Sequence, residues 1–400
     1  MNLVAISGAY MRSRLLGTSL VIALLALGMA TITVLMLVTA QLEERMHRDA
    51  RGIDLVAGAK GSPLQIVLSS IYHVDVPTGN IPLAQAEEIA RHRLVKQAVP
   101  LSLGDSHQGF RIVGTRHSFA TLYGARLARG ALWGKPLEAV AGSEAAARAG
   151  LEIGASFAGA HGLDEAGTAH ADAPYKVVGV LAPTGGVVDR LILTGIESVW
   201  YVHDEQHGLP AERYEPDASE REVTALLIQY ASPLAATVLP RYINANSELQ
   251  SASPAHETAR LFSIVGIGVD VLRGFALVLV LAAGLGIFVA LYHALEDRRY
   301  DLAIMRMLGA SARKVMALLL CEGMLLVGAG TVLGIGLGHV MTEMLGILLS
   351  QAKQPAVTGW VFLPEELWLV VLAVGVGAAA ALLPAWRAYR TDIAATLAAG

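Results

Sequence analysis

One stretch decides the fold of this chain: EDRRYDLAIMRMLGASARKVMALLLCEGMLL, residues 296–326. Basic residues gather in its first two thirds, and long apolar runs lie on both sides of them. A basic segment between two apolar runs is typical of a cytoplasmic connection between two membrane spans. The alternative interpretation is a positively charged loop that only sets the orientation of the chain in the membrane.

The same stretch has the pattern of an amphipathic helix. Leu302, Met305 and Leu308 fall near one face, and arginines recur every seven residues along it. Gly309 suits the end of such a helix. We therefore expect a helix within residues 294–314 that lies along the cytoplasmic surface and leaves one face free to dock on another protein.

The composition indicates a membrane protein with a sizeable soluble part. The chain has 400 residues, of which 54% are hydrophobic and 16% are charged. The formal net charge of −4 argues against a role with nucleic acid, because nucleic-acid binders are more often basic. The single cysteine, Cys321, excludes a disulfide bond within the chain, so any external domain folds on its core alone.

Four apolar segments are long enough to cross a membrane. The first run is too long for the apolar core of a cleaved signal peptide, and basic residues flank the predicted cytoplasmic ends. The predicted parts are a cytoplasmic segment (1–14), a first span (15–40), a periplasmic α+β domain (41–262), a stalk with the second span (263–293), the cytoplasmic helix (294–314), a third span (315–349), a short periplasmic loop (350–366), a fourth span (367–384) and a cytoplasmic tail (385–400).

The region between the first two spans has the pattern of a mixed α+β domain. Apolar or alternating runs bounded by turn residues predict strands at 109–115, 175–181, 190–195 and 223–230. Two segments between them, 83–96 and 143–151, have the pattern of short helices.

Two motifs resemble those of the FtsX-like, MacB-type permeases of ABC transporters. The first is DLAIMRMLGASARKVMALLLCEGMLL, and the second is the closing LLPAWRAYRTDIAATLAAG. The matching positions are Ile304, Arg306, Leu308, Gly309, Ala310, Arg313, Glu322, Pro384, Ala385, Arg387, Ala388 and Leu397. Ile393 stands where the family usually has proline, a small departure.

The resemblance implies a permease subunit in the bacterial inner membrane that binds no cofactor itself. ATP and magnesium would be bound by a separate ABC ATPase subunit, and the permease would form a homodimer. Membrane lipid surrounds such a protein, and a periplasmic adaptor or substrate protein is a further partner of this class. The residues that would couple the permease to the ATPase are Arg298, Arg299, Asp301, Ile304, Arg306, Leu308, Gly309 and Arg313.

The sequence leaves more than one function open. A MacB-type system would export or extract a lipoprotein, lipid, peptide, drug or metallophore. An FtsX-like mechanotransmitter would instead activate a periplasmic enzyme, and a further alternative is a system that handles zinc or a metallophore. An anchored enzyme or sensor is a third reading, but the sequence contains no Walker A loop, no His-Glu-x-x-His motif and no Gly-x-Ser-x-Gly elbow.

Polar and small residues in the third span predict helix contacts. Glu322 lies deep in the apolar run, where a carboxylate facing lipid is costly, so we expect it to contact another helix of the permease. Gly330, Gly334 and Gly338 recur every fourth residue and predict a face for close helix approach.

Histidines give the one hint of a ligand. Ten of the 12 lie in the predicted periplasmic domain. His203 and His207 are four apart, which on a helix places both imidazoles on one side, and His161 and His170 flank a polar loop with Asp164. These four histidines are candidate ligands for zinc, but exposed histidines without a metal explain the pattern equally well.

Overall fold

The computed structural model describes residues 3–162, 170, 172–204, 210–214, 216–217, 221–351 and 357–390. The chain divides into two compact units: a helical unit, Met1–Leu42 with Val265–Gly400, and an α/β unit, Glu43–Ile264. Part of the predicted periplasmic loop and the end of the predicted tail, including Leu397, lie outside the described residues.

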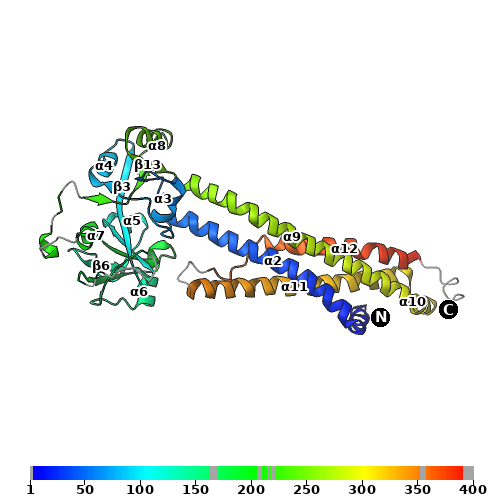
Figure 1. The fold of residues 1–400 in the computed structure, drawn as a ribbon. Helices are drawn as coiled ribbons and strands as arrows, with labels where there is room; N and C mark the ends of the chain where they lie inside the picture. The colour runs from blue at the N-terminus through cyan, green and yellow to red at the C-terminus, as the bar shows by residue number, and fades with distance from the viewer. Residues whose placement is uncertain are drawn as a thin grey trace. The chain divides into compact units, whose positions relative to one another are not determined.

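Long helices dominate the helical unit (Figure 1). Its described helices are α1 (Leu3–Ser13), α2 (Leu15–Asp49), α9 (Pro254–Asp297), α10 (Arg299–Met307), α11 (Ala312–Gln351) and α12 (Glu366–Arg390). Among the described residues, α2, α9, α11 and α12 are long and apolar enough to cross a membrane, which confirms the predicted number of spans. α2 and α9 also supply residues to the α/β unit.

Three glycines spaced four residues apart bring α11 against α2. A β-carbon built at Gly330 would lie 2.7 Å from Cδ2 of Leu25, and one at Gly334 would lie 2.6 Å from Cβ of Met29. A β-carbon built at Gly338 would lie 2.6 Å from Cβ of Thr33. The backbones therefore approach as closely as small residues permit, and any larger side chain would force the helices apart.

One mixed sheet forms the centre of the α/β unit. In the described residues its strand order is β13-β1-β12-β3-β4-β10-β6-β9-β5, with β7 paired to β9 and β8 to β3, while β2 and β11 form a separate pair. The strands are β1 (Leu55–Ala59), β2 (Ile81–Pro82), β3 (Val95–His107), β4 (Phe110–Thr115), β5 (Leu127–Gly130), β6 (Glu138–Ala141), β7 (Ser156–Phe157), β8 (Ala160–His161), β9 (Tyr175–Leu181), β10 (Leu191–Gly195), β11 (Glu222–Val223), β12 (Ala225–Tyr230) and β13 (Leu249–Ala252).

Side chains on both faces of the central strands are buried. On β12, Leu227 packs in one apolar cluster with Val99, and Leu226 and Ile228 pack in another with Ile243. Burial on both faces explains why this strand has a nearly continuous apolar run. The helices of the unit are α3 (Pro63–Ser70), α4 (Leu83–Ala90), α5 (Ser118–Leu122), α6 (Ser143–Ala149), α7 (Ile196–His203) and α8 (Ala235–Asn246), with 3₁₀ turns η1 (Val187–Arg190) and η2 (Ala211–Arg213).

Three predicted strands are found within a residue or two as β4, β9 and β10. The strand predicted over 223–230 is divided into β11 and β12, which belong to different sheets. The helix predicted over 83–96 is too long. α4 ends at Ala90 because the Leu94 amide donates to Nδ1 of His92 and the chain enters β3 at Val95. The helix predicted over 143–151 ends at Ala149, where Gly150 takes a left-handed φ of 66°.

Candidate functional site

The basic stretch forms a short helix with a well-defined end. α10 covers Arg299–Met307, which is shorter than the predicted span of 294–314. Gly309 has a φ of +97°, its amide donates to the Arg306 carbonyl at 3.1 Å, and the Ala310 amide donates to the Met305 carbonyl at 3.0 Å. This pair of bonds is the Schellman arrangement, which depends on the glycine because other residues rarely take that φ.

One face of α10 is buried and its C-terminal end is exposed. Leu302 and Ala303 are buried within the helical unit, but Met307 is 67% exposed and Leu308 is 83% exposed. Most of the other predicted coupling residues are also exposed: Arg299, Asp301, Ile304, Gly309 and Arg313. Arg306 is half-buried. The segment therefore presents exposed apolar side chains at its C-terminal end and exposed charged residues elsewhere along it, a combination found in protein-docking surfaces.

Arg298 does not belong to that exposed surface. Its side chain is 10% exposed and pairs with Glu322 of α11, with 3.3 Å between Nη1 and Oε2. The guanidinium also lies over the ring of Tyr10 in α1, 3.6 Å from the ring centroid. Arg298 thus neutralises the buried Glu322 and ties α11 to α1, because an isolated carboxylate at this depth is costly.

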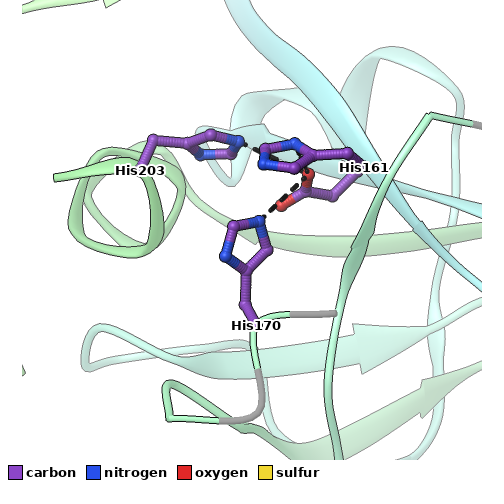
Figure 2. Close-up of side chains that lie close together, drawn as sticks. His161, His170 and His203 are labelled. Carbon is purple, nitrogen blue, oxygen red and sulfur yellow. Dashed lines mark ion pairs between the residues drawn. The ribbon is translucent and has the colours of Figure 1, made fainter. Parts of the chain in front are cut away.

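Four side chains converge in the α/β unit: Asp105, His161, His170 and His203 (Figure 2). One ligand atom of each lies within 4.8 Å of those of the others. Oδ1 of Asp105 is 3.2 Å from Nδ1 of His161, 3.8 Å from Nε2 of His170 and 3.4 Å from Nε2 of His203. We call these four residues the histidine–aspartate cluster.

The backbone places each member of this cluster. Asp105 of β3 and His161 of β8 are direct cross-strand partners, next to an irregularity in the register of β3 with β4. The His170 amide donates to the Gly159 carbonyl at 2.9 Å, just before β8. His203 is the last residue of α7, and its ring lies next to Gly104 of β3, where a β-carbon would be 3.7 Å from Nε2.

Hydrogen bonding fixes how the ring of His203 faces Asp105. Its Nδ1 lies 2.8 Å from the Val199 carbonyl, which can only accept, so Nδ1 carries the hydrogen. In the neutral ring, Nε2 then directs a lone pair towards the carboxylate. Asp105 is 3% exposed, and within the described residues neither of its oxygens has a hydrogen-bond partner of regular geometry. The cluster is therefore rich in acceptors and poor in donors.

The charges in the cluster shift the pKa values of its members. Burial acts to raise the pKa of Asp105, but the neighbouring imidazoles, His203 foremost, lower it overall. The Asp105 carboxylate raises the pKa of His203. Burial lowers the pKa of His170, and the nearby His161 and His203 act in the same direction. The pKa shifts of these two rings therefore run in opposite directions: His203 is easier to protonate and His170 is harder.

Sequence reasoning found three members of the cluster and missed the fourth. The helical spacing proposed for His203 and His207 does not apply, since α7 ends at His203 and Asp204 is extended, with ψ of 99°. His207 and Asp164 lie outside the described residues. Asp105 carried one usable signal: it is an aspartate within an alternating strand sequence, where aspartate is uncommon.

A cavity of about 340 Å³ in the α/β unit has His203 in its wall, together with Asp204, Trp200 and Thr224. None of these neighbours belongs to the cluster, so the cavity lies beside it and His203 borders both. The cavity and the cluster are features of the α/β unit, and α10 is a feature of the helical unit.

Four apolar helices with an α/β unit inserted between the first two define the class: a multi-pass membrane protein with a periplasmic-type domain. The MacB-like periplasmic core domain matches residues 18–239, more than half of the chain, and the FtsX-like permease C-terminal domain matches residues 273–393. The chain therefore belongs to the MacB/FtsX-type family of ABC transporter permeases. The resemblance seen in the two sequence motifs is confirmed.

Solved structures that are similar to this chain include two of low identity. The periplasmic region of MacB from Actinobacillus actinomycetemcomitans is 10% identical, with a TM-score of 0.34, and the match covers 54% of this chain and 97% of that one. The extracellular domain of the noncanonic ABC-type transporter YknZ from Gram-positive bacteria is 12% identical, with a TM-score of 0.31, over 50% of this chain and 99% of that one. No curated protein sequence matches the chain.

Proposed function

We propose that this chain is the permease subunit of a MacB-type ABC transporter in the bacterial inner membrane. A separate ATPase subunit hydrolyses ATP with magnesium, and the permease passes the resulting motion to its α/β unit, which acts on the substrate outside the membrane. The functional assembly contains two copies of the permease. Membership of the permease family supports an ATPase partner for this chain.

The exposed end of α10 carries this proposal. Leu308 and Met307 are large apolar side chains, both mostly exposed, at the end of a helix whose opposite face is buried among the other helices. Exposed apolar side chains ringed by charges are typical of the centre of a protein interface. Arg313 follows them in the chain, is exposed, and would complement an acidic partner surface.

The α/β unit is the proposed site of action on a substrate. It has a sheet of its own, three apolar clusters and the cavity beside His203, so it can bind a ligand without a channel through the spans. Export or extraction of a lipoprotein, lipid, peptide, drug or metallophore remains the range of substrates that this proposal covers.

Co-purification tests the proposal. The tagged chain is isolated from its native membrane in mild detergent, bound proteins are identified by mass spectrometry, and hydrolysis of magnesium ATP is measured. We expect an ATPase subunit with a Walker A motif and measurable hydrolysis. Leu308→Glu should reduce both by roughly tenfold or more, because a central interface side chain contributes about 2 kcal/mol or more to binding.

Leu234→Glu is the matched control, since Leu234 is also exposed but belongs to the α/β unit. It should leave ATPase recovery unchanged. Recovery of equal ATPase with Leu308→Glu would remove α10 as the docking element, and recovery of no ATPase with the unaltered chain would contradict the proposed function itself.

A further inference from the structure

The histidine–aspartate cluster supports an inference that goes beyond the proposed function and does not depend on it. Three imidazole nitrogens and one carboxylate oxygen surround a common point in the α/β unit (Figure 2). We propose that Asp105, His161, His170 and His203 bind a single zinc ion.

The distances fit a tetrahedral zinc ion. Zinc binds imidazole nitrogen and carboxylate oxygen at about 2.0–2.2 Å, which sets ligand atoms about 3.3 Å apart at the corners of a tetrahedron. The three imidazole nitrogens lie 3.2, 3.4 and 3.8 Å from Oδ1 of Asp105. The remaining ligand separations are all within 4.8 Å, which is at most about 1.5 Å above this value.

The chemistry of the four ligands selects the kind of metal. Imidazole nitrogens suit zinc and its neighbours in the first transition series, whereas magnesium and calcium require mostly oxygen ligands. Three histidines and one aspartate complete a four-coordinate shell, as in zinc sites that hold protein segments together.

A cation resolves the electrostatic conflict inside the cluster. Nε2 of His203 and Oδ1 of Asp105 are both acceptors when the ring is neutral, and they lie 3.4 Å apart. A divalent ion between them binds both lone pairs at once. The Val199 carbonyl, which accepts from Nδ1 of the same ring, orients the imidazole in the way that outer-shell partners of zinc ligands do.

The position of the ligands gives the ion a structural role. Asp105 lies on β3 and His161 on its partner strand β8, and His203 is the last residue of α7. The amide of His170 is hydrogen-bonded to the Gly159 carbonyl, just before β8. The ion therefore cross-links β3, β8 and the C-terminal end of α7, and it fixes one wall of the cavity beside His203. His161 is 50% exposed, which leaves a path by which the ion can enter.

Metal titration of the full chain tests this inference. The protein is purified in detergent with an affinity tag that contains no histidine, stripped with EDTA, and titrated with cobalt(II) and then with zinc. We expect one ion per chain, visible absorption bands of four-coordinate cobalt, their loss on addition of zinc, and no competition by magnesium. These readouts require neither ATP nor a partner ATPase, so they separate this inference from the proposed function.

His161→Ala and His203→Ala should each weaken zinc binding by more than about 100-fold, because even outer-shell changes cost 10- to 100-fold. His256→Ala is the matched control: this histidine is exposed in the same unit and outside the cluster, and its removal should change nothing. Asp105→Asn keeps the side-chain volume, so that weaker zinc binding by this variant cannot be explained by a loss of folding. Unchanged affinity in all three cluster variants, or no bound ion in the unaltered chain, would overturn the inference.

Discussion

The two units of this molecule each bury a carboxylate, but they neutralise it in opposite ways. In the helical unit, Glu322 faces the guanidinium of Arg298, whose charge is permanent and is covered by the ring of Tyr10. In the α/β unit, Asp105 faces three imidazoles whose charge depends on protonation. The first group is complete by itself, and the second offers its lone pairs to a cation.

This difference separates a structural ion pair from the proposed zinc site. The guanidinium of Arg298 keeps its charge and suits a buried ion pair, so the Arg298–Glu322 pair holds helices together. Imidazoles are both bases and metal ligands, so the same buried negative charge becomes a site when histidines surround it. The four predictions that follow test this contrast, beginning with the largest expected effect.

Breaking the Arg298–Glu322 pair should have the largest effect. Arg298→Met or Glu322→Leu alone leaves a buried charge without its partner, which costs about 3–5 kcal/mol of stability. The double variant should recover most of this loss, because an apolar pair replaces both charges. Thermal unfolding of the detergent-purified chain measures the effect, with the exposed Arg313→Met as control. A double variant as unstable as the sum of the single ones would show that the pair is not self-contained.

Metal removal should affect the α/β unit and leave the ion pair untouched. Zinc at 100 times its dissociation constant stabilises a protein by about 2.7 kcal/mol. At about 2–4 °C per kcal/mol, EDTA should lower the melting temperature by about 5–10 °C. Asp105→Asn should abolish this zinc response, and Glu322→Gln should retain it. An equal response in both variants would place the ion elsewhere.

Substitution of glycines should disturb the packing of the helical unit on one face of α11 but not on another. A β-carbon at Gly334 would lie 2.6 Å from Met29, whereas one at Gly336 meets no atom within 4 Å. Gly334→Val should therefore destabilise the protein by about 1–3 kcal/mol through overpacking. Gly336→Val is the matched substitution and should be nearly neutral. The thermal unfolding assay measures both, and equal losses would contradict the close contact with α2.

A buried histidine without a carboxylate gives the smallest expected effect. Burial, with Arg111 and Arg190 nearby, lowers the pKa of His73 well below its ordinary value. The unfolded chain binds a proton at this residue below about pH 6.5 and the folded chain does not, so stability falls as the pH drops below that value. The contribution of one group reaches at most about 1.4 kcal/mol per pH unit.

His73→Asn should make this pH dependence shallower, and asparagine tolerates the positive φ of 54° at this position. Melting curves of the unaltered and variant chains between about pH 7.5 and 5.5 provide the comparison. Parallel pH profiles would show that folding does not lower the pKa of His73.

Local patterns predicted the fold well because its spans, strands and α10 are encoded by consecutive residues. Gly309 could be assigned a helix end because its role depends only on its own backbone. The role of Arg298 could not be predicted, because its burial depends on Glu322 and Tyr10, which are distant in sequence. The same limit applies to Asp105, which joins His161 only through the pairing of β3 with β8.

Motion of the α/β unit under ATP is the central claim of this account, and a distance measurement tests it most directly. Cys321 is the single cysteine, so Cys321→Ser with Leu234→Cys gives one spin-label site per chain, exposed in the α/β unit. Double electron–electron resonance on the proposed complex with its ATPase then measures the distance between the spin labels on the two permease copies. The account predicts a distribution that shifts between nucleotide-free and ATP-trapped states, and that no longer shifts with Leu308→Glu. An identical distribution in both states of an actively hydrolysing complex would contradict it.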